Sequence, residues 1–308
     1  MVKDVRDIKI GKHTITIGNE QKILFPKSKI TKGELIDYYR RIAPTMLPYL
    51  KNRSLTMQRF VDGIGEEGFY QKDASAYFPS WIKRKKVKRQ DDGFVNYVVC
   101  NDAATLVYLA NQVSITNHVW LSKIDKLRYP DRMIFDLDPS KKNDFKRVKQ
   151  AAKDIKILLE SLGLVSFVMT TGSRGLHVVV PLKRTENFTF VRTFARDVAD
   201  YMAFQNPKVL TTEIRKNKRR GRIFVDWLRN SFGATGVAPY SVRPKEGAPV
   251  ATPLTWKELD NPKLAPDKYT IKNIFARLSK MGDPFKGIEK RTKSLKKARN
   301  MLDKLVAE

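Results

Sequence analysis

Apolar residues in the second half of the chain recur with two different periods, which predicts a sheet covered by helices. A period of two is typical of strands, and a period of about 3.6 is typical of amphipathic helices. In chain order the pattern predicts a strand at 132–138, a helix at 144–162, strands at 165–171 and 176–182, a helix at 187–204, and strands near 209–215 and 222–228. This β-α-β-β-α-β order is that of an RRM-like, split-βαβ sheet with its helices on one face.

The first part of the chain predicts a second α/β module. Alternation over residues 8–16 indicates a hairpin. Thr31 and Glu34 have the spacing of a capping box, so a helix should begin at Lys32. Pro44 should disturb the far end of that helix. The other predicted elements are strands at 54–60 and 94–99, an exposed basic loop at 82–93, and helices at 101–113, 271–281 and 290–305.

No internal repeat and no long Pro-, Gly- or Ser-rich linker divides the sequence. With 308 residues, 42% of them hydrophobic, the chain can bury a sizeable core. We therefore expect a single α+β domain over residues 1–308. Within it, an N-terminal module (about 1–115) should pack on a catalytic module (about 116–285), followed by a basic helix (about 288–306).

Charge changes this picture, because 60 Lys and Arg residues outnumber 32 Asp and Glu residues and give a net charge of +28. Such an excess causes self-repulsion and is usually offset by an anionic partner. Aromatic residues are interleaved with the basic ones, as in Phe69-Tyr70-Gln71-Lys72. A membrane binder more often gathers its basic residues on one amphipathic helix. We therefore expect a nucleic acid and no membrane as the partner.

The single cysteine, Cys100, excludes a disulfide framework and a cysteine zinc site. The sequence contains no run of roughly 18 apolar residues, so it predicts no membrane span. The charged N-terminus does not resemble a secretory signal. We expect a cytoplasmic, nucleoid-associated protein.

The candidate chemistry begins with Asp136 and Asp138, at the end of the predicted strand 132–138. Because side chains alternate along a strand, both acids project from one face, about 7 Å apart. Two neighbouring carboxylates on a buried strand repel each other and lose hydration, and a divalent cation relieves both effects. A lone Asp-x-Asp pair also occurs at strand ends that face solvent, so this pattern by itself leaves both interpretations open.

A third acid, Asp226, lies at the end of another apolar strand. If both strands belong to one sheet, it can join the first two acids, and three carboxylates are a common means of holding two Mg²⁺ or Mn²⁺ ions for phosphoryl transfer. Taken alone, Asp226 is equally well explained as a cap before a loop.

The segment 170–177 (TTGSRGLH) predicts a glycine-rich turn between two strands. Glycines let backbone approach a ligand closely, and hydroxyl, guanidinium and imidazole groups are donors to phosphate. The segment lacks the pattern of a P-loop. It is either a hairpin-type triphosphate cradle or an ordinary turn that contains an arginine.

The three motifs DLDP (136–139), SRGLH (173–177) and FVDW (224–227), in this order, resemble those of the archaeo-eukaryotic primase superfamily. Most of all, the chain resembles the polymerase domain of prokaryotic end-joining DNA ligase D and its stand-alone relatives. The resemblance runs from KILFP at 22–26 to APYSVR at 238–243. It implies a primase-polymerase fold for the whole chain.

The resemblance implies a role for specific side chains. Asp136, Asp138 and Asp226 would be catalytic and hold two divalent metal ions, Mn²⁺ or Mg²⁺. The residues implied to bind the incoming NTP or dNTP are Thr171, Ser173, Arg174, His177, His118 near the sugar, and Arg243. Lys22 and Lys32 would bind the recessed 5′-phosphate of gapped or broken DNA, Phe69 and Tyr70 would stack on template bases, and Arg219 would help to organise the metal site.

By the same resemblance, the chain would be a nucleotidyltransferase that fills gaps and extends ends in non-homologous end joining, with a preference for ribonucleotides. A Ku-like end-binding protein and a DNA ligase, in the same or another chain, would be its partners. The basic loop at 82–93 matches a loop that helps to bring two DNA ends together. A primase, a two-metal nuclease and a non-catalytic architectural binder are the alternative functions.

Overall fold

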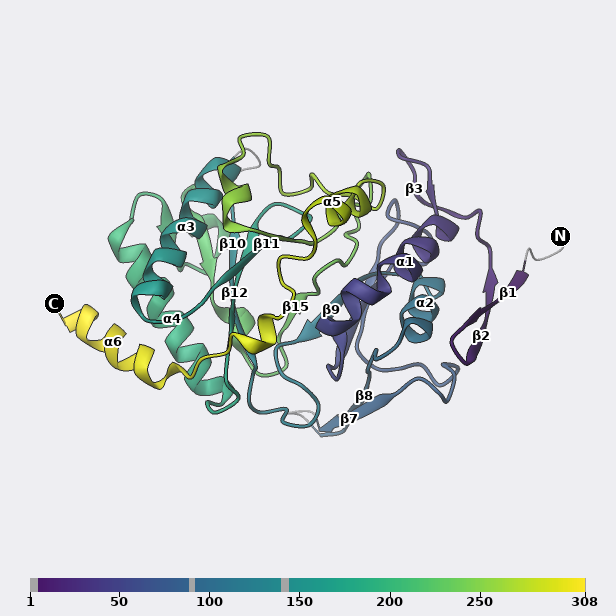
Figure 1. Ribbon diagram of the computed structural model, residues 1–308, viewed down its shortest axis with the longest axis horizontal. Helices are drawn as coiled ribbons and strands as arrows, with labels where there is room; N and C mark the ends of the chain where they lie inside the picture. Colours follow the sequence, from purple (N-terminus) through teal and green to yellow (C-terminus); the bar gives the residue numbers. More distant parts are fainter. Residues whose placement is uncertain (1–4, 89–91, 140–143, 308) are drawn as a thin grey trace. The chain divides into compact units, whose positions relative to one another are not determined.

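A computed structural model describes residues 5–88, 92–139 and 144–307 (Figure 1). The chain forms two compact units and passes between them several times. The first unit comprises Met1–Trp120, Val237–Ala251 and Tyr269–Ser279, and the second comprises Leu121–Gly236, Thr252–Lys268 and Lys280–Glu308. Within the described ranges, no helix is both long enough and apolar enough to cross a membrane.

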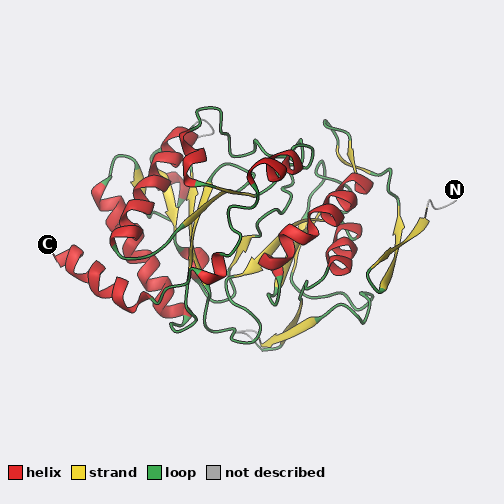
Figure 2. Cartoon of the chain, viewed as in Figure 1, coloured by secondary structure: helices red, strands yellow, loops and turns green. Residues whose placement is uncertain are grey.

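The first unit combines helices with short sheets and hairpins (Figure 2). One sheet has the strand order β15-β9-β5-β6. The elements are β1 (Val5–Ile10), β2 (His13–Gly18), β3 (Ile23–Phe25), β4 (Ile30–Thr31), α1 (Lys32–Leu50), β5 (Leu55–Arg59), β6 (Phe69–Gln71), β7 (Arg84–Lys88), β8 (Phe94–Val98), α2 (Ala103–Asn111) and β9 (Ser114–Trp120), while β15 (Thr235–Val237) and α5 (Ile274–Met281) lie where the chain crosses between units.

The capping box predicts the start of α1 correctly. The Glu34 backbone N–H donates to the Thr31 hydroxyl at 3.3 Å, and the Glu34 carboxylate accepts from the Thr31 N–H at 2.8 Å. The prediction for Pro44 is wrong, because the helix continues through Pro44 and Pro48 to Leu50. An interior proline costs about 3 kcal/mol. The fully buried apolar face of α1 outweighs that cost.

The predicted basic loop at 82–93 is wrong at residues 84–88. Residues 84–88 form β7, which pairs antiparallel with β8 from Arg84–Val98 to Lys88–Phe94. Val87 is the buried position of β7, and the Lys86 ammonium lies 4.2 Å from the Phe94 ring centroid. Cross-strand pairing therefore organises a segment whose charge suggested a loop. Residues 89–91 of that prediction lie outside the described part of the chain.

The second unit contains a six-stranded sheet with the order β13-β14-β10-β12-β11-β16. The four central strands have the antiparallel arrangement of a split-βαβ fold, which confirms the predicted α+β class. Helices α3 and α4 lie on one side of this sheet (Figure 1). The elements are β10 (Arg132–Asp138), α3 (Phe145–Ser161), β11 (Phe167–Thr170), β12 (Leu176–Pro181), α4 (Phe188–Gln205), β13 (Leu210–Thr211), β14 (Ile223–Asp226), β16 (Thr252–Leu254) and α6 (Leu295–Ala307), with short 3-10 turns η1 (Lys216–Lys218), η2 (Leu228–Asn230), η3 (Trp256–Asp260) and η4 (Ile288–Lys290).

The last helix, α6, begins at Leu295, five residues after the predicted position 290. The buried Glu186 carboxylate accepts a hydrogen bond from the Ser294 hydroxyl at 2.8 Å and from the Leu295 N–H at 3.5 Å. A carboxylate at this place satisfies N–H groups that the first turn leaves without partners. This contact fixes the start of α6 on the second unit.

Candidate active site

The two acids of the DLDP motif lie on the central strand β10. Asp136 is 9% exposed, whereas Met133, Phe135 and Leu137 are completely buried. The alternation therefore separates an acidic face from an apolar face along one strand. The predicted placement of Asp136 and Asp138 on a common face agrees with this pattern.

The third acid lies directly across the sheet. Strand β14 pairs antiparallel with β10, and Asp226 is the register partner of Asp136. Opposite residues of an antiparallel pair have Cβ atoms about 4.5–5.5 Å apart. The fold thus brings Asp226 beside the first two acids.

Burial makes the negative charge of this cluster unfavourable. Loss of hydration, followed by the charge of Asp136, raises the pKa of Asp138 and of Asp226 above the usual value for aspartate. Oxygen-only donors of this kind suit Mg²⁺ and Mn²⁺. Within residues 5–88, 92–139 and 144–307, however, no three or more His, Cys, Asp or Glu side chains are arranged as a metal site. The acids contact cationic side chains of the protein.

Arg229 is the principal cation at this cluster, and the sequence analysis did not identify it. Its Nε lies 3.4 Å from an Asp136 carboxylate oxygen and 3.5 Å from an Asp226 oxygen. The nearby charges of Asp136 and Asp226 raise the pKa of Arg229, although burial opposes this. The only sequence signal was its spacing of three residues after Asp226, within a 3-10 turn.

The glycine-rich turn at 171–175 packs against β10. The Thr171 N–H donates to the Gly175 carbonyl at 3.1 Å, and the Gly175 N–H donates to the Thr171 hydroxyl at 3.3 Å. A Cβ at Gly175 would stand 2.0 Å from the Leu137 carbonyl oxygen, so only glycine fits. Gly172 has φ +65°, which favours glycine there too. The turn is therefore shaped to lie beside the acidic strand.

Two predicted phosphate donors contact the acids, Arg174 from this turn and His177 from strand β12. His177 is the register partner of Asp136, and its Nε2 lies 3.5 Å from an Asp136 oxygen. An Arg174 guanidinium nitrogen lies 3.4 Å from an Asp138 oxygen. Arg174 is exposed and Ser173 is half-buried. The second unit thus brings together Asp136, Asp138, Asp226, Thr171, Ser173, Arg174 and His177.

Arg219 is a buried residue that directly follows η1. Its guanidinium donates to the carbonyls of Glu213 and Ile214 at 3.0 and 2.9 Å, and lies 3.9 Å from the Phe224 ring centroid. Phe224 is the register partner of Asp138, and the charge of Arg219 offsets part of the rise in the pKa of that acid that burial and Asp136 cause. Arg219 therefore acts on the cluster through its field.

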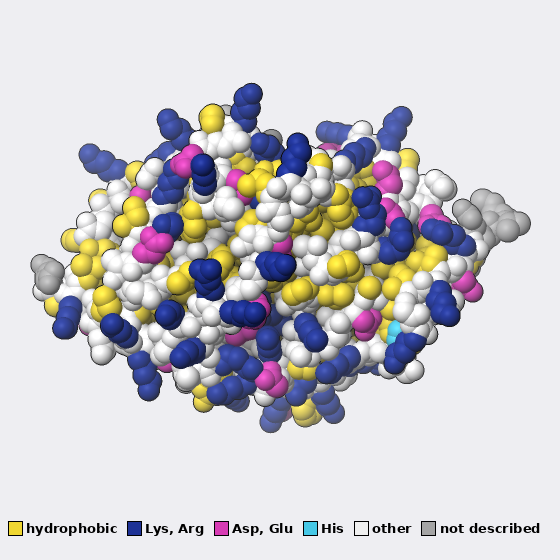
Figure 3. Space-filling view, viewed as in Figure 1, with side chains coloured by type: hydrophobic (Ala, Val, Ile, Leu, Met, Phe, Trp, Pro, Cys, Tyr) yellow, Lys and Arg dark blue, Asp and Glu magenta, His cyan; other side chains and the backbone are white. Residues whose placement is uncertain are grey.

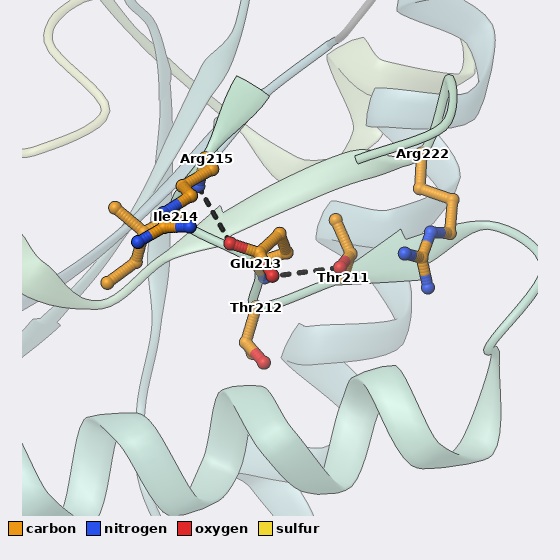
Figure 4. Close-up of a pocket in the computed structure, with 6 residues that line it drawn as sticks. All are labelled: Thr211, Thr212, Glu213, Ile214, Arg215 and Arg222. Carbon is orange, nitrogen blue, oxygen red and sulfur yellow. Dashed lines mark hydrogen bonds between the residues drawn. The ribbon is translucent and has the colours of Figure 1, made fainter. Parts of the chain in front are cut away.

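An open hollow of about 610 Å³ lies beside this segment, at the edge strand β13. Figure 4 shows its lining residues, Thr211, Thr212, Glu213, Ile214, Arg215 and Arg222. The Arg215 N–H donates to the Glu213 carboxylate at 2.9 Å. None of the three acids lines this hollow.

In the first unit, the two predicted 5′-phosphate lysines lie near each other. Lys22 forms a 2.6 Å ion pair with Asp62, and Lys32 is 8% exposed and donates to the Gly18 carbonyl at 2.6 Å. Burial, and then the charge of Lys22, lowers the pKa of Lys32. Two cations held this close in a strongly basic protein form an anion-binding candidate. Figure 3 shows Lys and Arg side chains spread over the face in view.

The predicted stacking pair is exposed on the edge strand β6. Phe69 is 47% and Tyr70 is 60% exposed. The Arg59 guanidinium lies 5.6 Å from the Phe69 ring centroid. The Tyr70 ring lies edge-on to the His118 ring, at 5.7 Å. The first unit therefore brings His118 beside Tyr70.

Arg243 lies on the segment 237–251 of the first unit, which is hydrogen-bonded to β9. The Thr116 hydroxyl donates to the Val242 carbonyl at 2.7 Å, and the Arg243 N–H donates to the Pro249 carbonyl at 2.7 Å. His118 is on β9, two residues beyond Thr116. The predicted nucleotide-binding residues are thus divided between the two units.

Comparison with known proteins indicates the same family as the order of the motifs does. The family model described as LigD, primase-polymerase domain, matches residues 31–285. The bifunctional non-homologous end joining protein LigD of Bacillus subtilis (strain 168) is 36% identical over 266 residues, which are 86% of this chain and 42% of that protein. The multifunctional LigD of Pseudomonas aeruginosa is 34% identical over 274 residues, 88% of this chain and 32% of that protein.

A solved structure supports the fold. The polymerase domain from Mycobacterium tuberculosis ligase D, in complex with DNA, superposes with a TM-score of 0.84 at 29% identity. The match covers 91% of this chain and 99% of that domain. The chain spans less than half the length of the curated relatives named above.

We predict that Asp226→Asn stabilises the metal-free protein at neutral pH. Because the pKa of Asp226 is raised on folding, the folded state holds its proton at higher pH than the unfolded chain does. The free energy of unfolding should therefore fall as pH rises from the pKa of Asp226 in the unfolded chain to its pKa in the folded protein. Above the folded-state pKa the whole of this stability is lost. Asparagine removes that charge and keeps an acceptor for the Leu228 N–H. The melting temperature should rise by about 2 °C or more.

Asp260→Asn is the matched control, because Lys153 lowers the pKa of the exposed Asp260 and the sign is reversed. Thermal melts of both variants and the wild type between acidic and neutral pH measure the effect. An Asp226→Asn protein less stable than the wild type at neutral pH would contradict the prediction.

Proposed function

The chain belongs to the LigD primase-polymerase family, and from this premise we propose that it is a template-dependent nucleotidyltransferase. It would fill gaps and extend broken DNA ends in non-homologous end joining. One observation carries the proposal: three acids on two adjacent strands lie beside Arg174 of the glycine-rich turn and beside His177 of the neighbouring strand β12. Carboxylates serve metals and the turn serves phosphates, so together they suit a nucleoside triphosphate.

Asp136, Asp138 and Asp226 would hold two divalent ions, Mn²⁺ or Mg²⁺. Their all-oxygen donor set and their raised pKa values fit this role, since a divalent cation offsets the repulsion that burial intensifies. The ions would neutralise charge at the attacking and leaving oxygens. The three aspartates, held on adjacent strands of one sheet, would position these ions.

The turn at 171–175 would hold the triphosphate. Thr171 and Gly175 fix its backbone, and it carries the half-buried Ser173 and the exposed Arg174 as donors. The buried His177 follows the turn on β12. Arg174 is exposed, so it is accessible to a ligand. His118 and Arg243 of the first unit would contribute contacts to the sugar and the phosphates.

The first unit would contact DNA. Lys22 and Lys32 would bind a recessed 5′-phosphate, with the first turn of α1 adding its partial positive charge. Exposed Phe69 and Tyr70 would stack on template bases, and the basic hairpin β7–β8 would take part in bringing ends together. The related M. tuberculosis domain was solved in complex with DNA.

A Ku-like protein and a ligase would act with this chain, at the nucleoid in the cytoplasm. The relatives are longer and their names describe several activities, so ligation would come from another part of a longer protein or from another chain. De novo priming uses the same chemistry and is the second candidate. A nuclease could use the same acids, but would not need the turn at 171–175.

The three acids provide the main test. Alanine at Asp136, Asp138 or Asp226 should reduce primer extension on gapped DNA with Mn²⁺ to below a few per cent, roughly a hundredfold loss. DNA binding should persist, because it depends on basic residues. Asp260→Ala is a control outside the cluster. Substantial extension by any of the three variants would refute its metal role, and release of mononucleotides without extension would indicate a nuclease.

A second prediction concerns the lysine pair. Lys22→Ala and Lys32→Ala should weaken binding to gaps that carry a downstream 5′-phosphate, and should reduce the salt dependence by about one unit of slope. Fluorescence anisotropy with phosphorylated and unphosphorylated gaps measures this, with Lys9→Ala as the control. Equal losses on both gaps would show generic backbone contacts. Melting curves separate such losses from the structural contact of Lys32 with Gly18.

A third prediction concerns the sugar. Wild type should use ribonucleotides more efficiently than deoxynucleotides, because an imidazole can pair with a 2′-hydroxyl and is left unpaired by the analogue that lacks it. His118→Ala should reduce this ratio. The values of kcat/KM for matched nucleotide pairs decide the question, with Tyr70→Phe as a control that keeps the ring beside His118. A wild type that prefers deoxynucleotides would contradict the sugar argument, and an unchanged ratio would exclude His118 as its reader.

A further inference from the structure

Arg229 stands on a turn that is fixed to the acidic strand. Strand β14 ends at Asp226, and the Asn230 side chain then replaces it along β10. It accepts a hydrogen bond from the Ile134 N–H at 2.9 Å and donates to the Ile134 carbonyl at 2.8 Å. Asn230 is completely buried and also donates to the Trp227 carbonyl at 2.9 Å. The backbone that carries Arg229 is therefore held rigidly beside the acids.

The Arg229 side chain contacts two acids from different strands at once. The same Nε lies 3.4 Å from Asp136 Oδ2 and 3.5 Å from Asp226 Oδ2. The side chains of the acids are 12% and 15% exposed, whereas that of Arg229 is 45% exposed. The acids are enclosed, and the cation that contacts them has solvent into which it can move.

The other side chains that contact the acids use different oxygens. His177 contacts Asp136 Oδ1, and Arg174 contacts Asp138 Oδ1. Arg229 therefore serves the Asp136–Asp226 pair, which the register places face to face. Guanidinium keeps its proton at any ordinary pH, so this charge is permanent.

We propose that Arg229 is a resident counterion of the Asp136–Asp226 pair, which it stabilises in the metal-free protein and must release when a divalent cation binds there. The inference rests on the metal role proposed above for the acids. A divalent cation needs the carboxylate oxygens at about 2.0–2.6 Å and repels a guanidinium that shares them. Arg229 is thus a positioning residue that opposes metal binding while it keeps the empty cluster folded.

A purely structural ion pair makes a different prediction. Its loss would lower stability equally with and without metal, and would leave metal affinity unchanged. A counterion that competes with metal couples the two quantities, because whatever binds only one state shifts the equilibrium by its differential affinity. Stability and metal affinity must therefore be measured on the same variants.

The test compares Arg229→Gln with Arg192→Gln, a nearby exposed arginine that lies over the Trp227 ring at 5.2 Å. Mn²⁺ binding is followed by the electron paramagnetic resonance signal of free Mn²⁺, and melting is measured with and without Mn²⁺. Metal-free Arg229→Gln should melt about 2–4 °C below wild type. It should bind Mn²⁺ about three- to tenfold more tightly. Saturating Mn²⁺ should abolish the melting deficit, and Arg192→Gln should match wild type throughout.

Wild-type Mn²⁺ affinity in Arg229→Gln, or a melting deficit that persists in saturating Mn²⁺, would overturn the counterion role and leave the proposed function intact. If Arg229→Gln does not fold, Arg229→Lys carries the test. Lysine keeps the charge with a single ammonium group, so Mn²⁺ affinity should rise by a smaller factor, and an unchanged affinity would overturn the proposal. A wild type that binds no Mn²⁺ would overturn this inference together with the metal role of the acids.

Discussion

Repulsion among carboxylates that the sheet brings face to face is the constraint on which the rest of the second unit depends. Asp136 and Asp226 are register partners on β10 and β14, Asp138 is two residues further along, and all three lose much of their hydration. Buried like charges are unfavourable unless cations accompany them. The guanidinium groups of Arg229 and Arg174 lie against these acids and offset part of that repulsion.

Several features without charge serve the same arrangement. Asn230 continues the hydrogen bonding of β10 where β14 ends, which fixes the turn that carries Arg229. Gly175 allows the phosphate-binding candidate turn to approach the Leu137 carbonyl more closely than any side chain would permit. Backbone and side-chain groups around the cluster thus hold the three carboxylates together, although their repulsion lowers the stability of the folded protein. Sites of this kind commonly exchange stability for function.

The strand and helix pattern was predictable wherever burial follows a clear period. The bounds of β10 match the predicted 132–138, because apolar and acidic side chains alternate along it. Prediction failed where tertiary packing overrides local preference. The buried face of α1 carries the helix past Pro44, and pairing with β8 makes a strand of the basic segment 84–88. At the start of α6 the Ser294 hydroxyl accepts from the Lys296 N–H, a local signal, and it also donates to Glu186, a residue distant in sequence that no local pattern could indicate.

The sequence by itself determined which residues are candidates for the chemistry, and their order along the chain. Side-chain alternation in β10 requires Asp136 and Asp138 to share a face, and the order of the motifs points to the family that the comparisons show. Only the tertiary structure decided that Asp226 lies opposite Asp136, and that Arg229 contacts both. It also decided that residues 237–251 return to the first unit, with Arg243 among them. Strand register and contacts between distant segments depend on packing summed over the whole fold, and no short stretch of sequence contains that information.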